Sequence, residues 1–229
     1  MWPEVLLIPG AYILGSVPHL LLLAKLRHVE LGGDFHQVLW YKAGKVTGVL
    51  GVVGEFIKGI LPVLVGKALD FNIAIVAGAG LAAVCGQMWP VFSKFDGEKG
   101  NSIGLAMSMA LAPISCLIAL VPLIIALLIR LTPRVIAKRG TGGDKPVIGG
   151  PYSRSLPVGM AICFLILPFI AWYRGEPRET VWCLGALFIL IMIRRLTAGL
   201  RNDLKTTKDV TGVLVGRLLY DRATTEWRQ

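Results

Sequence analysis

Apolar stretches of membrane-spanning length alternate with polar segments along most of the chain. A helix needs about 20 apolar residues to cross a bilayer, and stretches of this length with few charges predict transmembrane helices. The polar segments between them carry nearly all of the charged residues. The pattern predicts an all-α integral membrane protein whose apolar stretches are residues 5–24, 46–66, 71–92, 101–131, 156–173 and 180–193.

The stretch at residues 101–131 is long for one crossing, and Pro113 divides it. Proline removes a helical hydrogen bond and bends or ends a helix. The piece before it, residues 101–112, would be about 18 Å long at 1.5 Å per residue, which is short of a hydrocarbon core of roughly 30 Å. We therefore expect a half-helix that begins within the protein, followed by a longer helix.

The distribution of basic residues decides the number of crossings. If the long stretch crosses twice, 20 lysines and arginines lie on one side of the membrane and 3 on the other, whereas a single crossing gives 8 against 15. Cytoplasmic loops carry the excess of basic residues in membrane proteins. The sequence thus predicts about seven transmembrane helices, including the half-helix, with the N-terminus outside and the C-terminus in the cytoplasm.

Composition agrees with this prediction and narrows the class of partner. Hydrophobic residues make up 55% of the chain and charged residues 17%, and the mean hydropathy is +0.67. The net charge of +10 lies mainly beside the spans, so membrane lipids rather than nucleic acid are the expected partners. The four cysteines are scattered singly, which predicts neither disulfides nor a metal site.

We expect a membrane domain at residues 1–200 and a charged cytoplasmic tail at 201–229, with a short surface helix near 213–219.

Glu55 and Lys58 lie near the middle of the second apolar stretch. Charged residues in a membrane helix cost roughly 2.5–3.5 kcal/mol each on insertion scales, and they usually face a protein interior or a water-filled cavity. At a spacing of three residues they share one helix face and can neutralise each other. The pair therefore predicts a polar interior, and either a structural role or a role in a site would explain it.

A second polar region is the loop ahead of the predicted half-helix, where Gly97, Gly100 and Gly104 flank Lys99. Glycine allows a ligand to approach the backbone closely, and a helix N-terminus favours an anion. Lysine adds a point charge that suits phosphate. An anion site and an ordinary charged turn explain this composition about equally well.

Three segments resemble the bacterial acyl-phosphate:glycerol-3-phosphate acyltransferases, small seven-helix membrane enzymes of phospholipid synthesis. They are AYILGSVPHLLLLAKLR (11–27), GEFIKGILPV (54–63) and GQMWPVFSKFDGEKG (86–100). The family's segments read roughly GSIPFG…AK, DxxKG and GHxFPVFxxFKGGKG, in the same order. The resemblance implies transfer of a fatty acyl group from an acyl phosphate to the 1-hydroxyl of glycerol-3-phosphate or a related acceptor. It also implies that no cofactor is needed and that the protein lies in the bacterial inner membrane.

The resemblance implies a site that works by positioning two anionic substrates and neutralising their phosphates, without a dedicated protein nucleophile. The matching residues with an implied catalytic role are Ser16, Glu55, Lys58 and Lys99. Those expected to bind a substrate phosphate are Gly97, Lys99, Gly100, Asn101, Ser102, Ser155 and Arg195. No metal ligand is expected among them.

The chain departs from the family pattern at several polar positions. Gln87 stands in place of the family's histidine, and Asp96 in place of the first lysine of KGGKG. The family's first-loop motif, GSGNxGATNxxR, has no counterpart, and its HREN motif corresponds at best to residues 194–197. These departures leave an alternative open, in which the protein keeps the frame but binds a lipid or a membrane partner without catalysis.

Two further regions are candidates for a role in the site. His28 and His36 flank Asp34 in the first loop, and either an acid–base role or plain solvent exposure fits them. His19 lies inside the first span, where structural packing and function are equally good explanations.

The loop at 137–155 carries basic residues, among them Lys138, Arg139 and Lys145. We expect them to supply the anion-binding groups that the family has in its first loop and this chain lacks there.

Overall fold

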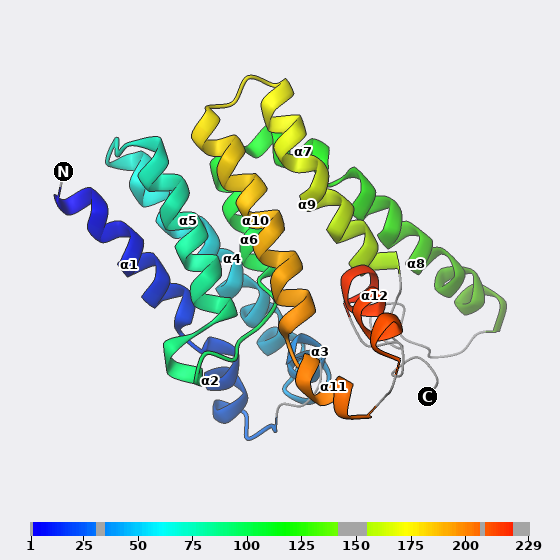
Figure 1. Cartoon of the computed structure of the whole chain (residues 1–229). Helices are drawn as coiled ribbons and strands as arrows, with labels where there is room; N and C mark the ends of the chain where they lie inside the picture. The colour runs from blue at the N-terminus through cyan, green and yellow to red at the C-terminus, as the bar shows by residue number, and fades with distance from the viewer. Residues whose placement is uncertain (1, 31–34, 142–154, 207–208, 222–229) are drawn as a thin grey trace. The chain divides into compact units, whose positions relative to one another are not determined.

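The computed structural model describes residues 2–30, 35–141, 155–206 and 209–221, and every regular element in these ranges is helical (Figure 1). The chain divides into two compact units. The first contains residues 1–114 and 175–183, and the second contains residues 115–174 and 184–229. Asp34, Lys145 and the rest of the stretch 142–154 lie outside the described residues, so the hypotheses placed on them stay predictions.

The first unit is built from α1 to α6. Their bounds are α1 Trp2–Ser16, α2 His19–Leu26, α3 Phe35–Lys42, α4 Lys45–Ala68, α5 Ile73–Met88, the short 3₁₀ helix Val91–Ser93 and α6 Asn101–Leu111. The second unit holds most of α7 Pro113–Ala119, with α8 Val121–Thr141, α9 Ser155–Tyr173, α11 Leu200–Thr206 and α12 Val210–Tyr220. Helix α10, Arg178–Thr197, contributes to both units.

Six helical segments of the described chain are long and apolar enough to cross a membrane. They are Glu4–Leu26, Lys45–Ala68, Ile73–Ser93, Pro113–Pro133, Ser155–Tyr173 and Arg178–Thr197. The predicted half-helix is the shorter apolar helix α6, which ends at Leu111, and α7 begins at Pro113. The all-α integral membrane fold is confirmed, and so is the break at Pro113.

The first apolar stretch differs from the prediction because it is not one continuous helix. Helix α1 ends at Ser16, and α2 begins at His19. Pro18 cannot donate a backbone hydrogen bond, so the carbonyl oxygens at the end of α1 lack their usual helical partners. The break places polar backbone groups beside Ser16.

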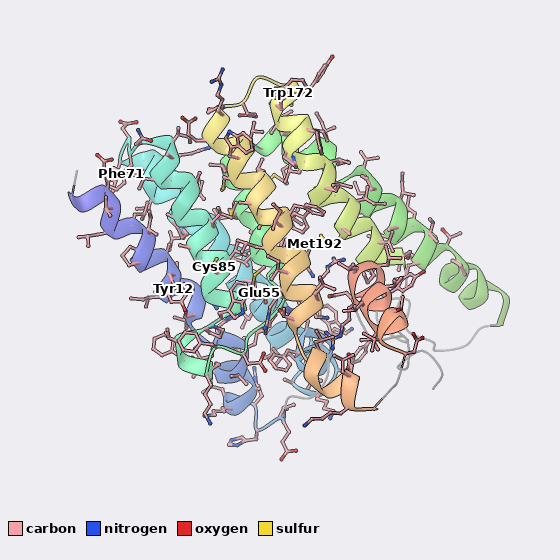
Figure 2. The ribbon with its side chains drawn as sticks, viewed as in Figure 1. Tyr12, Glu55, Phe71, Cys85, Trp172 and Met192 are labelled. Carbon is pink, nitrogen blue, oxygen red and sulfur yellow. The ribbon has the colours of Figure 1, made fainter. Side chains whose placement is uncertain are left out.

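Glycine brings α1 and α5 into close contact (Figure 1). A methyl group on Gly15 would lie 3.0 Å from the Cα of Ala83, and one on Gly86 would lie 2.9 Å from the backbone nitrogen of Ser16. Small residues allow helix backbones in membranes to approach this closely. The hydroxyl of Tyr12 also donates a 2.7 Å hydrogen bond to the carbonyl of Trp89, which fixes the register of the two helices. Figure 2 labels Tyr12 and Cys85 on these neighbours.

The second unit includes part of the region expected to be a tail. Helix α12 packs against α9, and Val213 on it is fully buried. The guanidinium of Arg217 forms an ion pair with Asp203 and donates to the carbonyl of Ala198. The expected short helix is therefore present and belongs to the second unit, with a longer extent than predicted. The domain boundary at residue 200 stays a prediction.

Candidate active site

The loop between α5 and α6 folds back against the last turn of α5. The backbone N–H of Gly97 donates to the carbonyl of Met88 at 3.2 Å, and the N–H of Glu98 donates to the carbonyl of Gln87 at 3.1 Å. Gly100, with φ of +74°, then turns the chain into α6 in a conformation that glycine adopts without strain. The loop holds Glu98 next to Gln87, and the Gly97 amide predicted to bind phosphate is engaged within the protein.

Four side chains from different elements meet at this loop, and we call them the polar cluster: His36, Glu55, Gln87 and Glu98. The Gln87 amide donates to Oε1 of Glu55 at 2.6 Å and lies 3.4 Å from Oε2 of Glu98. Nε2 of His36 lies 3.1 Å from Oε2 of Glu55 and 3.8 Å from Oε2 of Glu98. Glu55, which Figure 2 labels, is fully buried, as expected of a charge kept in a membrane helix only where it has partners.

The half-helix α6 begins beside Glu55. Ser102, in its first turn, is close enough to the Glu55 carboxylate to interact with it. The N-terminus of a helix favours negative charge because its first N–H groups lack helical partners. We predicted that the N-terminal end of α6 would favour an anion. In the structure, this end lies beside the Glu55 carboxylate of the protein itself. Asn101 stands next to it, and its buried Oδ1 has no hydrogen-bond partner among the described residues.

Lys58 lies one helical turn from Glu55 and faces the break in the first span. Its ammonium donates to the carbonyl of Gly15 at 3.2 Å and also to the carbonyl of Val17. Gly15 lies in the last turn of α1 and Val17 follows it, and a cation is favoured at the C-terminal end of a helix. Glu55 and Lys58 share one buried face as predicted. However, Glu55 contacts the polar cluster, while Lys58 contacts α1.

A pocket of about 110 Å³ opens beside the polar cluster. The residues lining it come from α1 to α5 and the loop after α5, and include Ser16, His19, Lys58, Gln87, Gly97 and Glu98. Three segments that are distant in sequence and carry the family resemblance thus line one cavity. Within it, the Ser16 hydroxyl donates a 2.9 Å hydrogen bond to the carbonyl of Tyr12, so this serine is not arranged as a nucleophile.

His19 contributes chiefly to packing. Its Nε2 donates to the carbonyl of Gly51 at 2.9 Å, and a methyl group on Gly54 would lie 2.8 Å from the same nitrogen. The ring is therefore held tightly between α2 and α4. Of the histidines weighed from the sequence, His36 is the one that lies in the polar cluster.

Ser155 and Arg195 belong to the second unit. The Ser155 hydroxyl donates to the carbonyl of Ala126 at 3.0 Å. The Arg195 guanidinium is almost fully buried, donates to the carbonyl of Pro157 at 3.0 Å and lies 3.8 Å from the carboxylate of Asp221. Lys99 is half-buried in the loop beside Glu98. The phosphate-binding roles expected for these three residues stay predictions.

Glu98 is a site residue that the sequence patterns did not predict. It occupies the second glycine position of the KGGKG pattern, so the departure at that position was the available signal. It lies in the loop outside the membrane-spanning segments and lines the pocket, and its carboxylate lies near that of Glu55. Burial, together with the nearby Glu55 carboxylate, raises the pKa of Glu98 to about 8.

The grouping of His36, Glu55 and Glu98 also resembles a cation site, since their ligand atoms lie within 4.8 Å of one another. Hydrogen bonds explain it without an ion, because the Gln87 amide lies between the two carboxylates and the Nε2 of His36 faces both. Protons and N–H groups are therefore sufficient to hold the two acidic side chains together.

A family model described as glycerol-3-phosphate acyltransferase matches residues 5–203. The chain belongs to this family. A glycerol-3-phosphate acyltransferase of Trichlorobacter lovleyi is 38% identical over 209 residues, covering 86% of this chain and 96% of that protein. Relatives with the same name from Geotalea daltonii and Geobacter metallireducens are 38% and 40% identical. Those two matches span 64% and 62% of the relatives' own length.

Two crystal structures of the integral membrane glycerol 3-phosphate acyltransferase PlsY share the fold. The lysophosphatidic acid form superposes with a TM-score of 0.66 at 24% identity and covers 89% of this chain and 93% of that one. The glycerol 3-phosphate form gives a TM-score of 0.67 at 23% identity, with 94% of each chain covered. At this identity the similarity establishes the architecture, which agrees with the multi-helix membrane fold described above.

Proposed function

We propose that the protein is a membrane acyltransferase of phospholipid biosynthesis. It transfers a fatty acyl group from an acyl phosphate to glycerol-3-phosphate or a closely related acceptor. The observation that carries this proposal is the convergence of the three family-like segments on one pocket. Family membership and the names of the relatives support it.

The chemistry needs little from the protein beyond placement. The acceptor hydroxyl attacks the acyl carbon, a new C–O bond forms, and the bond to the phosphate oxygen breaks to release inorganic phosphate. Holding the two reactants together removes much of the entropic barrier, and nearby cationic groups stabilise the phosphate that leaves. In the first unit, Lys99 is the loop lysine proposed for this electrostatic role, while Lys58 holds the end of α1 against α4.

The pocket lies at the end of α1 and α5, beside the loop that carries Lys94 and Lys99. We place this end in the cytoplasm because the excess of basic residues falls on the same side. The N-terminus is then outside, the C-terminus is cytoplasmic, and the protein lies in the bacterial inner membrane. A water-soluble phosphorylated acceptor would reach the pocket from the cytoplasm, and the acyl donor would reach it from the lipid.

The function is tested by assaying the purified full-length protein in liposomes with palmitoyl phosphate and radiolabelled glycerol-3-phosphate. Lysophosphatidate should form, palmitoyl-coenzyme A should not replace the donor, and Lys99→Ala should reduce the rate. Arg174→Ala is the matched control, because Arg174 is exposed in the turn after α9. The absence of product from a folded wild-type protein would contradict the proposed acyltransferase activity.

A second candidate, a non-catalytic relative that binds a lipid or a partner, is favoured by one observation. Asp96 lines the pocket and adds negative charge where a phosphate would be expected. Carboxylates disfavour an anion at close range. A folded protein that binds phospholipid vesicles but gives no product with any acyl phosphate would support this candidate.

A further inference from the structure

Arg195 places a guanidinium in the interior of the second unit, in the last turn of α10. The residue is only 1% exposed. Its Nη1 donates to the carbonyl of Pro157 in α9 at 3.0 Å and to that of Leu218 in α12 at 3.4 Å. Its Nε and Nη2 are buried and have no hydrogen-bond partner within the described part of the chain. Because unmet donors in a protein interior cost free energy, this guanidinium is suited to a ligand with several acceptor oxygens.

The carboxylate of Asp221 faces this guanidinium from the end of α12. Its Oδ1 lies 3.8 Å from Nε of Arg195, which is within the range of an ion pair but too long for a hydrogen bond. A buried ion pair stabilises a fold only when its hydrogen-bond geometry compensates for the loss of hydration. The carboxylate of Asp221 therefore neutralises Arg195 without satisfying its donors, and another anion can replace it at small cost.

Helix α12 is docked by contacts that do not involve Asp221. The helix packs against α9, and its Val213 is fully buried. Arg217, on the same helix, forms an ion pair with Asp203. The match to the family model ends at residue 203, so α12 lies beyond the matched region. The docking of this added helix brings the carboxylate of Asp221 to Arg195.

We propose that α12 is an autoinhibitory helix, in which the carboxylate of Asp221 occupies the place of a phosphate at Arg195. The inference rests on the proposed function and on the phosphate-binding role predicted for Arg195. While α12 is docked, Asp221 competes with the phosphate group of a substrate for the guanidinium. Once α12 is released, Nε and Nη2 of Arg195 can donate to two oxygens of one phosphate, a geometry that a guanidinium matches well.

The test measures kcat and KM of the full-length protein in phosphatidylcholine liposomes, with glycerol-3-phosphate and palmitoyl phosphate varied in turn. Asp221→Asn is nearly isosteric and removes the competing charge. It should leave kcat unchanged and lower the KM for one of the two substrates by about 5-fold or more, the lower end of the coupling between linked binding events. Val213→Ser should lower the same KM because it weakens the docking of α12. Val215→Ser, at an exposed position of the same helix, is the matched control and should behave as the wild type.

A KM that is unchanged or raised in both Asp221→Asn and Val213→Ser would overturn the inference and leave the acyltransferase intact. A purely structural ion pair predicts that outcome, together with lower stability. Unchanged KM values with a kcat of Asp221→Asn that responds to phosphatidylglycerol in the liposomes would assign the anion to a lipid headgroup and contradict competition with substrate.

No product from a folded wild type would contradict the proposed function, and calorimetric titration with glycerol-3-phosphate and palmitoyl phosphate would then decide on α12. Tighter binding of either ligand by Asp221→Asn than by the wild type would support the autoinhibitory helix. Equal binding of both ligands would overturn it.

Discussion

The carboxylate of Glu55 and the side-chain amide of Gln87 are joined by a 2.6 Å hydrogen bond between α4 and α5, across 32 residues of sequence. Gln87 stands where the family resemblance leads us to expect a histidine. The substitution therefore preserves an N–H donor to the buried carboxylate, although it removes an ionisable ring. A position that departs from the family pattern in the sequence therefore has a structural partner in the fold.

This hydrogen bond predicts that Gln87→Leu destabilises the protein. The substitution leaves one oxygen of a fully buried carboxylate without its donor, and hydrogen bonds to charged groups contribute about 1.5–3 kcal/mol. Chemical unfolding of the purified protein in detergent measures the change. Gln87→His is the matched control, because it retains an N–H donor and should lose much less. Equal stability of Gln87→Leu and the wild type would contradict the prediction.

Lys58 and Lys67 provide a second comparison, because both lie on α4 and both donate to carbonyls near the end of a neighbouring helix. Lys58 is buried and donates to the carbonyl of Gly15 in α1. Lys67 is exposed and donates to the carbonyls of Ala110 and Leu111 of α6 at 2.8 and 2.9 Å. Lys58→Met should cost about 1–3 kcal/mol, since it leaves carbonyls of the first span without their buried, charged donor. Lys67→Met should cost only about 0.3–1 kcal/mol.

The same unfolding titration in detergent measures both lysine variants. If both variants lose a similar amount of unfolding free energy, the burial of a lysine does not determine how much it stabilises the protein. In that case the interpretation of Lys58 as a buried helix-end partner would be wrong.

The sequence predicted most of the helical frame because span length and hydropathy are local properties. Pro113 was correctly identified as a break, since a proline in an apolar stretch has a direct steric effect. Pro18 acts in the same way and separates two helices within a single span, although the stretch around it was expected to form one helix. That break determines where Lys58 finds its acceptors.

The site was less predictable because its contacts join residues that are distant in sequence. Periodicity along α4 correctly placed Glu55 and Lys58 on one face, and it suggested that they neutralise each other. It contains no information on His36 or Gln87, which approach from α3 and α5. The roles of the predicted site residues stay predictions, and the place of Glu98 depends on the loop folding back against α5.

The contact between α1 and α5 predicts opposite effects of alanine at two glycines of the same helix. At Gly15 the new methyl group would collide with the backbone of Ala83, so the helices would have to separate, at a cost of about 1–3 kcal/mol or more. At Gly10 nothing lies within 4 Å, and alanine should be neutral or stabilise the helix by up to about 1 kcal/mol. Thermal unfolding of Gly15→Ala and Gly10→Ala in the same detergent makes the comparison. A neutral Gly15→Ala would show that the helices are not in close contact.

The raised pKa of Glu98 predicts that stability depends on pH in a defined direction. Glu98 has a pKa of about 8 in the folded protein, against an ordinary value of 4.5, so the folded state binds more protons between these values. Stability then falls as the pH rises, because it changes in proportion to the protons bound by the unfolded state minus those bound by the folded state. The contribution is fully present below about pH 4.5 and is lost as the pH passes through about 8.

Unfolding temperatures of the wild type should decline across this interval. Glu98→Gln, which keeps an uncharged side chain at every pH, should decline less, while Glu179→Gln should follow the wild type. A wild type and Glu98→Gln with parallel profiles would show that Glu98 is ionised at neutral pH, and its like-charge contact with Glu55 would then have to be relieved by another neighbour.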